Sequence, residues 1–466
     1  MKYKEYRFSP SVNLEDILAA RDFRTTMQKD LIEKYQLPLV VFTLNIAGPV
    51  KVFDLTRRTF YEGMSMIKEK LFVNNFSIFK EAIYEKITGY EAYLLLDGDA
   101  NNIKYSLLEV EEDTSLGRLF DIDVFDITGD KLCRTNYNKS FRKCLICDNV
   151  AFECGRSRKH SVDEVLEKEI EIMLDYFNQK YATKLSQIAL KSLLYEINTT
   201  PKPGLVDLNN NGAHTDLTVY LLQKSAICLE PFFKKFVYVG INNKEEKLSN
   251  ILPKLRILGK SAEYRMFKTT KNINTHKGAI FIFSIVLCSL GWLYANNIAY
   301  SREGIEKTIK ELSTNILNDF SYISRKKHVT HGEEVFIKYN ILGIRGEAAS
   351  GFHSLFTSFI TCLNNQLQKH SFNDSGVYTL LNIIMGIDDT NMISRSDYET
   401  VTYFKEEIHN AMSRETIDII NFASNLDKEF IHKGISAGGS ADLLALTYFI
   451  YFYEREVDVN LDRMKS

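Results

Sequence analysis

The pattern of the sequence changes at Ser161-Val162-Asp163-Glu164. A serine followed three residues later by a glutamate is the capping box that begins a helix, and helical spacing of apolar residues continues from there to about Ile197. Most later segments between polar loops keep this helical spacing, whereas earlier segments mix short apolar runs with helices. Because 466 residues are too many for one hydrophobic core, we predict two domains: an α+β domain over residues 1–178 and an all-α domain over residues 179–466.

The first domain is expected to contain both strands and helices. Short apolar runs bounded by turn residues predict strands over 38–44 and 92–96. The segment 121–127 alternates acidic and apolar residues, which is the period-two pattern of a strand with one polar face. Helical spacing predicts helices over 14–35 and 59–71.

In the second domain, helices are expected wherever apolar residues recur at helical spacing. These segments are 216–229, 245–258, 304–320, 355–368, 377–386, 398–426 and 443–453. A further run, 278–295, carries no charge and is just long enough to cross a bilayer. It contains Ser284, Ser289 and Gly291 and lacks a flanking basic cluster, so we expect a helix buried on all sides within the domain.

Composition restricts the class of partner and the compartment. A net charge of −2 gives no basic excess for non-specific nucleic-acid binding. Seven cysteines, an odd number in a long chain, do not indicate a secreted disulfide framework. No apolar segment follows the polar residues at the start of the sequence, so no signal peptide is expected. We therefore expect a cytoplasmic protein that binds neither nucleic acid nor a membrane.

An acidic pair is the sharpest chemical feature of the first domain. Asp121 and Asp123 lie two residues apart on an expected strand, so their side chains point to the same face. Two neighbouring carboxylates repel unless a cation or protons lie between them, and Mg²⁺ binds a few carboxylates together with substrate phosphates. With Arg118 beside the pair as a phosphate ligand, this arrangement predicts phosphoryl or nucleotidyl transfer. The alternative is a solvated acidic strand face.

The second domain contains five loops that combine small residues with charged ones. Their charged site candidates are Lys202, Asp207, His214 and Asp216 in 199–216, Lys277 in 274–279, Arg345 and Glu347 in 343–348, Asp389 in 388–391 and Asp442 in 436–442. Rigid loops commonly present binding and catalytic groups, so we predict one polar site in a phosphate- and metal-handling enzyme. The alternative is that these residues only cap loops, as Ser440-Ala441-Asp442 at a helix start would.

A cysteine cluster closes the first domain. Cys144-Leu145-Ile146-Cys147 is followed by Cys154, Arg156, Arg158 and His160. A Cys-x-x-Cys motif with a further cysteine and a histidine can hold zinc. The spacing to Cys154 and His160 is irregular, which favours buried thiols beside a phosphate-binding patch of Arg156, Arg158 and His160 instead.

Both halves of the chain resemble known families. Residues 1 to about 178 resemble the holo-citrate lyase synthase family, a phosphoribosyl-dephospho-CoA transferase. The segments that carry this resemblance are Leu18–Arg21, Asn45–Lys51, Leu116–Val124 and Cys144–Cys147 through Arg156–His160. Residues from about 179 to 466 resemble triphosphoribosyl-dephospho-CoA synthase through the five loops. Ala47 and His353 each stand where these families usually have proline, and neither departure removes a group expected to act in catalysis.

The resemblance implies a bifunctional transferase that makes and attaches the citrate lyase prosthetic group. The second half would join ATP and 3′-dephospho-CoA with release of adenine. The first half, a nucleotidyltransferase-like domain, would transfer the phosphoribosyl-dephospho-CoA group to a serine of the citrate lyase acyl carrier protein (its γ subunit) with release of pyrophosphate. Mg²⁺ is the expected cofactor.

Site roles follow from combining the residue patterns with this resemblance. In the first domain we expect catalysis and metal binding from Asp121 and Asp123, with phosphate binding by Arg118, Arg156 and Arg158. In the second domain the expected carboxylates for metal binding and sugar-cation stabilisation are Asp207, Asp216, Asp389 and Asp442. The expected phosphate ligands there are Lys202, Lys277 and Arg345, and the expected proton acceptor is Glu347 or His214.

Three rival interpretations remain at the level of sequence. The same chemistry could serve malonate decarboxylase, although the fusion and the Asn45–Lys51 segment favour citrate lyase. A second rival is a carrier-protein chaperone without catalytic activity. It would need the loops but not their charged residues, which are present. A membrane-associated factor would use the run 278–295.

Overall fold

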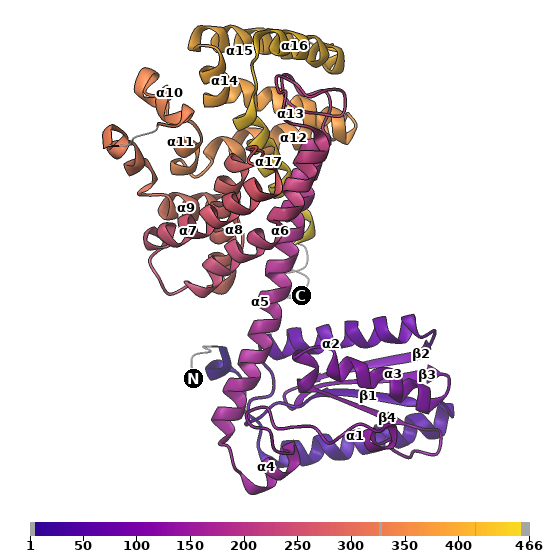
Figure 1. Ribbon diagram of the computed structural model, residues 1–466. Coiled ribbons are helices and arrows are strands. Elements are labelled where there is room, and N and C mark those ends of the chain that lie inside the picture. The colour runs from indigo at the N-terminus through magenta and orange to yellow at the C-terminus, as the bar shows by residue number, and fades with distance from the viewer. Residues whose placement is uncertain (1–4, 326–328, 415, 458–466) are drawn as a thin grey trace. The chain divides into compact units, whose positions relative to one another are not determined.

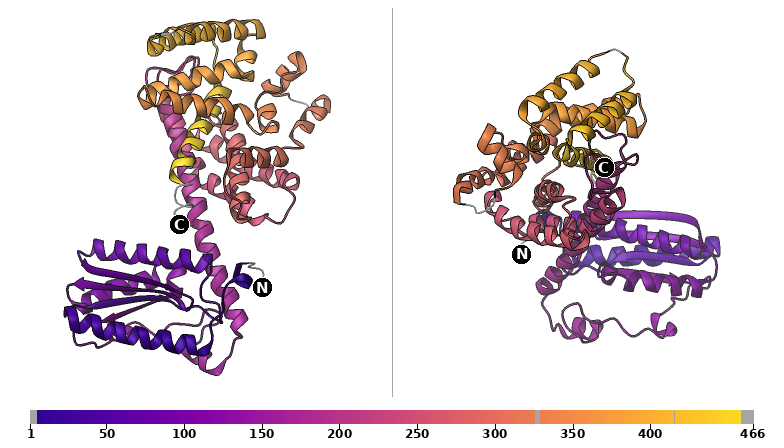
Figure 2. Two further views of the ribbon diagram at one scale, coloured as in Figure 1. Left: turned by 180° about the vertical axis from the view of Figure 1, so that it is seen from behind. Right: turned by 45° about the horizontal axis from the view of Figure 1, so that its top comes forward.

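The computed structural model describes residues 5–325, 329–414 and 416–457 (Figures 1 and 2). The chain divides after Gln179 into two compact units. The long helix α5 (Val162–Asn198) begins in the first unit and ends in the second. Its start is the expected capping box: Ser161 Oγ accepts from the Glu164 N–H at 3.2 Å, and the Glu164 carboxylate accepts from the Ser161 N–H at 2.8 Å.

The first unit is built on a four-stranded antiparallel sheet with the order β2-β3-β1-β4. Its strands are β1 (Leu39–Leu44), β2 (Ser77–Lys86), β3 (Gly89–Asp97) and β4 (Phe120–Phe125). Its other elements are α1 (Leu14–Tyr35), α2 (Asp54–Val73), α3 (Ala100–Glu112), α4 (Ala151–Ser157) and the 3₁₀ turns η1 (Glu5–Phe8), η2 (Leu116–Leu119) and η3 (Arg134–Tyr137). The prediction of an α+β domain is confirmed.

The two faces of this sheet differ in chemistry. Helices α2 and α3 cover one face, where β-strand residues such as Phe42 and Leu94 join the larger core (Figure 1). Helix α1 packs on the other face over a small cluster that includes Val41 and Tyr93. Because side chains alternate along a strand and Val41 pairs with Asp123, the carboxylates of β4 lie on the face of the small cluster.

The second unit is built of helices around one core. Besides the end of α5, its helices are α6 (Val219–Asn242), α7 (Leu252–Thr269), α8 (Lys277–Ala295), α9 (Arg302–Leu312), α10 (His331–Tyr339), α11 (Gly343–Ala349), α12 (Ile360–Gln366), α13 (Phe372–Gly386), α14 (Thr390–Arg395), α15 (Tyr398–Met412), α16 (Ile419–Lys433) and α17 (Gly438–Glu456). The 3₁₀ helices of this unit are η4 (Leu248–Asn250) and η5 (Ile316–Arg325), and η6 (Leu355–Phe359) is a π-helix.

Helix α8 is the uncharged run of the sequence, and it lies in the centre of this core. It is the one helix in the described part of the chain that is long and apolar enough to cross a membrane, and 72% of that stretch is buried inside the protein. Neighbours α6, α7, α9 and α17 pack against it. The prediction of a buried helix is confirmed.

Several predicted helix ends were wrong because side-chain caps set them. Helix α6 begins after Thr218, whose side chain accepts from the Leu221 N–H at 3.2 Å, so Asp216 lies in the preceding loop. The predicted helix 398–426 is two helices, because Asp418 caps a new start by accepting from the Asn421 N–H at 3.0 Å. Strand β4 ends at Phe125, where Asp126 accepts from two N–H groups of the following turn.

Candidate functional site

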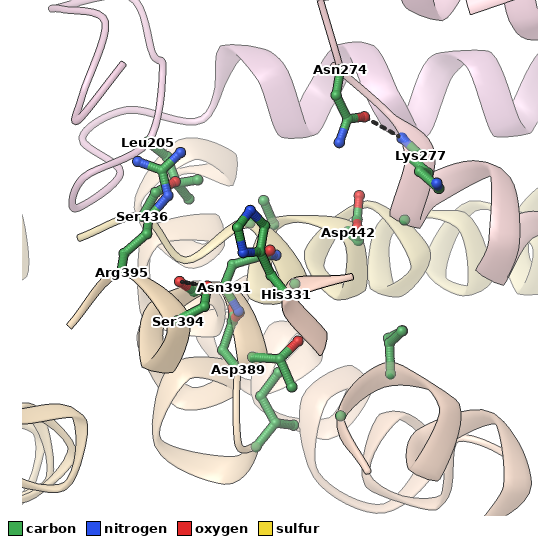
Figure 3. A pocket seen from close by; sticks show the side chains of 18 of the residues that line it. Leu205, Asn274, Lys277, His331, Asp389, Asn391, Ser394, Arg395, Ser436 and Asp442 are labelled. Carbon is green, nitrogen blue, oxygen red and sulfur yellow. Dashed lines mark hydrogen bonds between the residues drawn. The ribbon is translucent and has the colours of Figure 1, made fainter. Parts of the chain in front are cut away.

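A cavity of about 810 Å³ lies in the second unit, and all five charged loops contribute to its wall. Of the residues predicted from the sequence, those that line it are Lys202, His214, Asp216, Lys277, Glu347, Asp389 and Asp442. Figure 3 shows Lys277 and Asp442 on one side of the view and Arg395 with Ser436 on the other. The long helices α8 and α17 both begin at this wall, which turns the positive ends of their dipoles toward the cavity.

The Asp207 side chain holds the loop 199–216 in shape. The Asp207 carboxylate accepts from the N–H groups of Lys202 at 2.8 Å, Asn209 at 2.8 Å and Asn210 at 3.1 Å. Gly204 closes the turn at φ +66°, and a Cβ there would lie 2.1 Å from a carbonyl oxygen. Asp207 does not line the cavity; these hydrogen bonds hold the loop, and its catalytic role stays a prediction.

Lys202 is fully buried and already paired with a carboxylate. Its ammonium donates to Glu196 Oε1 at 2.5 Å and to the Glu196 carbonyl at 2.8 Å. Both residues line the cavity. Glu196 was not among the predicted site residues, because it lies in the last turns of α5, where one charged residue is ordinary.

Asp389 connects the starts of two helices, α14 and α17, at the cavity wall. It caps α14 by accepting from the Asn391 N–H at 2.9 Å, and it accepts from the Ser440 N–H at 2.7 Å and the Ser440 hydroxyl at 2.9 Å. Burial raises the pKa of Asp389, and the hydrogen bonds from Ser440 oppose that rise. These contacts fix the start of α17 where it meets the cavity.

Asp442 lies just after the first turn of α17 and faces the start of α8. Burial raises its pKa well above the usual range, and the charges of Glu196 and Asp389 raise it further. A Cβ on Gly278 would lie 1.8 Å from Asp442 Oδ2. The close approach of this carboxyl to α8 therefore requires glycine at position 278.

This contact predicts a selective effect of Gly278→Ala. The added methyl should displace Asp442 and lower the free energy of unfolding of the second unit by about 1–3 kcal/mol, the usual cost of overpacking. The single tryptophan of the chain, Trp292, lies in α8, so its fluorescence during urea unfolding reports on this unit. Gly259→Ala in α7 is the matched control, because a Cβ there meets open space; it should be neutral or stabilising by up to about 1 kcal/mol. Equal stability of both variants would contradict the packing argument.

Glu347 has a free carboxylate oxygen at the cavity wall. Its Oε2 atom is buried and accepts no hydrogen bond within the described residues. Burial raises the pKa of Glu347, with the Asp388 charge adding to the rise and His353 opposing it. A buried carboxylate with raised pKa and an unused oxygen is suited to accept a proton from a substrate.

Arg345, two residues before Glu347, points elsewhere. Its guanidinium lies 3.6 Å from Asp319 and 3.8 Å from Glu333, and it stacks over the Phe320 ring. It does not line the cavity. The Arg345 side chain therefore lies among the carboxylates of Asp319 and Glu333, and its phosphate contact stays a prediction.

His214 reaches the cavity from the loop 199–216 and lies beside Arg395, which was not predicted as a site residue. Its Nε2 lies 2.8 Å from the Ser436 hydroxyl, and its Nδ1 lies 3.5 Å from an Arg395 guanidinium nitrogen. Burial and the Arg395 charge lower the pKa of His214. Arg395 lies at the end of the short helix α14 and lines the cavity. It was not predicted because it lies beyond the loop 388–391.

In the first unit, β4 presents Asp121 and Asp123 on one face, paired in register with Thr43 and Val41. The Asp123 carboxylate lies 2.6 Å from the Lys131 ammonium. Asp121 is exposed to solvent, yet loss of hydration among the surrounding protein atoms raises its pKa, and the nearby Asp123 charge adds to this rise. The carboxylates are therefore close enough to repel, as the spacing predicts.

Basic residues missed by sequence analysis support this strand. Arg142 donates to the Phe120 carbonyl at 2.7 Å and pairs with the buried Glu111 at 2.6 Å. The nearly buried Lys104 donates to the Ile122 carbonyl at 2.7 Å. Arg142 and Lys131 both lower the pKa of Asp121, so they contribute positive charge beside the acidic face.

The predicted arginines of the first unit lie in different places. Arg118 donates to the Lys143 carbonyl at 2.6 Å, just before β4. Arg156 in α4 lies over the Phe152 ring, and Arg158 ends that helix in the left-handed conformation. His160, predicted beside these arginines, instead places Nε2 3.2 Å from Cys147 Sγ.

The Asn45–Lys51 segment is held by α5. The buried Glu169 accepts from the Ala47 N–H at 2.9 Å, and burial raises the pKa of Glu169 to about 7. Lys51 donates to the Ile46 carbonyl, and burial lowers the pKa of Lys51. This segment is therefore a rigid loop of the first unit.

Two family models match the chain, one in each unit. Residues 12–176 match the family described as apo-citrate lyase phosphoribosyl-dephospho-CoA transferase, and residues 182–460 match the family described as ATP:dephospho-CoA triphosphoribosyl transferase. Two relatives span nearly the whole chain. Protein CitXG of Haemophilus influenzae is 32% identical over 94% of this chain and 96% of the relative, and protein CitXG of Leuconostoc mesenteroides subsp. cremoris is 31% identical over 94% and 97%.

A third relative matches the second unit. The 2-(5′′-triphosphoribosyl)-3′-dephosphocoenzyme-A synthase of Haemophilus ducreyi is 32% identical over 65% of this chain and 98% of the relative. Two domains of these two kinds define a bifunctional transferase of citrate lyase prosthetic-group biosynthesis. The chain belongs to the CitXG family, in which a triphosphoribosyl-dephospho-CoA synthase domain follows an apo-citrate lyase phosphoribosyl-dephospho-CoA transferase domain.

Proposed function

We propose that the cavity of the second unit is the site where ATP and 3′-dephospho-CoA are joined. The convergence of five charged loops on one cavity carries this assignment. The α8 and α17 starts, Lys277 and Arg395 supply positive charge for the triphosphate. The carboxylates of Asp216 and Glu347 supply negative charge for a developing sugar cation.

The proposed reaction is a displacement at the ATP ribose. A ribose hydroxyl of 3′-dephospho-CoA forms a bond to C1 of that ribose while the bond from C1 to adenine breaks. Glu347, whose Oε2 is buried without a partner among the described residues, accepts the hydroxyl proton. Adenine leaves with the bonding electron pair and takes up a proton, and the triphosphate stays on the product. His214, held by Ser436 and Arg395, positions the reacting groups.

In the first unit we assign transfer to the acidic face of β4. The carrier-protein serine attacks the phosphorus nearest the ribose and loses its hydroxyl proton to solvent. The bond from that phosphorus to the pyrophosphate oxygen breaks, and pyrophosphate leaves with the bonding electron pair. Lys131 pairs with Asp123 at 2.6 Å, and the two carboxylates together would fit a divalent cation. Mg²⁺ there would neutralise charge on the phosphates. Two carboxylates on a sheet next to a glycine turn support a nucleotidyltransferase-like domain by analogy of arrangement.

Further assignments concern partners and compartment. The carrier protein of citrate lyase is the proposed macromolecular partner, ATP and 3′-dephospho-CoA are the proposed small substrates, and the cytoplasm is the proposed location. The burial of α8 supports a protein that acts without a membrane.

Adenine release tests the assignment of the synthase reaction. The full chain, incubated with ATP, 3′-dephospho-CoA and Mg²⁺, should release free adenine in an amount equal to the triphosphoribosyl product. Omission of dephospho-CoA or addition of EDTA should stop the release. Adenine release that needs no dephospho-CoA would identify a nucleosidase instead, and release unchanged by EDTA would contradict the metal assignment.

The two activities should be separable along the chain. Fragments cut within the 169–185 part of α5 should each fold and keep one activity, because each unit has its own core. The mixture should modify the carrier protein more slowly than the intact chain if tethering raises the effective concentration of the intermediate. Failure of every such pair to give soluble, active fragments would contradict the independence of the units.

A further inference from the structure

Three cysteines and one histidine come together in the first unit, away from the acidic pair. The ligand atoms of Cys144, Cys147, Cys154 and His160 all lie within 4.8 Å of one another. Cys147 Sγ is 3.5 Å from Cys154 Sγ and 3.2 Å from His160 Nε2. Within the described residues this is the one group of three or more cysteine, histidine or acidic side chains that converges closely enough to hold an ion.

Cys144 and Cys147 lie in one tight backbone turn. The Cys144 N–H donates to the Asn149 carbonyl at 2.8 Å, and a bridge between Lys143 and Val150 closes the base of the turn. Inside the turn, the Ile146 N–H points at Cys144 Sγ at 3.4 Å. A backbone N–H directed at sulfur stabilises a negatively charged thiolate more than a neutral thiol, because hydrogen bonds to charged acceptors are stronger.

The second half of the group is built by the end of α4. Cys154 lies inside this helix and is buried. Arg158 ends the helix with φ +48°, and the Lys159 N–H donates back to the Cys154 carbonyl at 3.1 Å. This left-handed turn reverses the chain, so His160 reaches the sulfur of Cys147.

We propose that Cys144, Cys147, Cys154 and His160 bind one Zn²⁺. Three sulfurs and one imidazole nitrogen form a common tetrahedral zinc ligand set, with zinc–sulfur bonds of about 2.3 Å that place ligand sulfurs about 3.8 Å apart. The separation of 3.5 Å between Cys147 and Cys154 is near that value. Binding releases the three thiol protons to solvent and leaves a complex with one negative charge.

Two other accounts of the group fit less well. A Cys147–Cys154 disulfide needs a sulfur–sulfur bond of about 2.05 Å, and it would leave Cys144 and His160 without a role. Thiols that are merely buried, as the irregular spacing favours, do not explain why His160 contacts Cys147 rather than the neighbouring arginines. The convergence of four ligand side chains favours the ion.

The ion would fix a segment that has little core of its own. Between β4 and α5, regular structure is limited to η3 and α4. This segment supports the acidic strand: Arg142 donates to the Phe120 carbonyl, and the Lys143 carbonyl accepts from Arg118. Zinc would therefore position these contacts, an effect that depends on the function proposed for the first unit, whereas metal binding itself does not depend on it.

Metal content of the full chain tests the proposal. Protein purified without chelators and without a histidine tag should contain one zinc per chain, as measured by inductively coupled plasma mass spectrometry. Cys147→Ser and His160→Asn should lose the zinc, and the control Cys133→Ser, at an exposed cysteine outside the group, should retain it. Because a ligand variant can also unfold the segment, cobalt replacement in the unmodified protein is the second measurement. It should give thiolate-to-cobalt charge-transfer bands and tetrahedral d–d bands.

Metal content and cobalt spectra test whether zinc binds, and carrier-protein modification tests whether the bound zinc positions the segment. Zinc below about one-tenth of the chain concentration, with the thiols of Cys144, Cys147 and Cys154 reactive or with a Cys147–Cys154 disulfide, would overturn the site. Zinc at one per chain with octahedral cobalt bands would overturn the ligand set. Cys147→Ser should keep adenine release and lose at least nine-tenths of carrier-protein modification; unchanged modification in a zinc-free variant would overturn the positioning role alone.

Discussion

Replacement of Glu347 by glutamine should slow adenine release by at least about a hundredfold, the scale of one general acid–base contribution. The amide keeps the size of the side chain but cannot accept a proton. The buried Oε2 of Glu347 has no hydrogen-bond partner within the described residues, so the variant loses no internal contact of that atom. Rates of adenine formation under saturating ATP and 3′-dephospho-CoA measure the effect.

The pH dependence gives this prediction a second signature. Burial raises the pKa of Glu347, and a base works only when deprotonated, so the rate should fall as the pH drops through that raised pKa. Glu347→Gln should remove this acidic limb. The control Glu303→Gln changes an exposed carboxylate in the first turn of α9 and should keep both rate and pH profile. A normal rate in Glu347→Gln would exclude Glu347 as the base and leave His214 as the remaining candidate.

Replacement of Asp121 or Asp123 by asparagine should abolish carrier-protein modification while adenine release continues. Each variant removes one charge from the proposed metal-binding pair, and loss of a metal ligand removes several kcal/mol of transition-state stabilisation. Intact-mass spectrometry of the carrier protein, supplied with preformed intermediate, measures the transfer reaction alone.

A matched control lies in the same unit. Asp148 is fully exposed in the turn between Cys147 and Val150, so Asp148→Asn should leave transfer unchanged. Raising the Mg²⁺ concentration should partly restore Asp121→Asn if its defect is weaker metal binding. Normal modification by both aspartate variants would remove the acidic face from the mechanism.

The parts of the fold that depend on local signals could be predicted from the sequence. The capping box at Ser161 and the alternation along β4 involve residues within a few positions of each other. Helix ends were less predictable, because a single capping side chain such as Thr218 or Asp418 decides them. The edge strand β2 was missed because most of its residues are partly or fully exposed, so no apolar run marks it.

The candidate site was predictable as a set of loops but not residue by residue. Loop composition identified the segments that meet at the cavity, since charge on glycine-rich loops is a local pattern. Which side chain faces the cavity depends on packing: Asp207 and Arg345 lie in the expected loops but are occupied by loop N–H groups and by Asp319 with Glu333. Glu196 and Arg395 reach the cavity from helices, where a single charged residue carries no signal.

A two-step transfer between variants tests the central claim, that the cavity makes the intermediate and the acidic face of β4 uses it. Asp121→Asn protein is incubated with ATP and 3′-dephospho-CoA, protein is removed by filtration, and the filtrate is given to Glu347→Gln protein with the carrier protein. We predict that the carrier gains the mass of one phosphoribosyl-dephospho-CoA group, whereas over the same time Asp121→Asn alone gives no modification from ATP and dephospho-CoA and Glu347→Gln alone gives about a hundredth or less. An unmodified carrier in a filtrate that contains adenine and intermediate would contradict the assignment of the two reactions to these two sites.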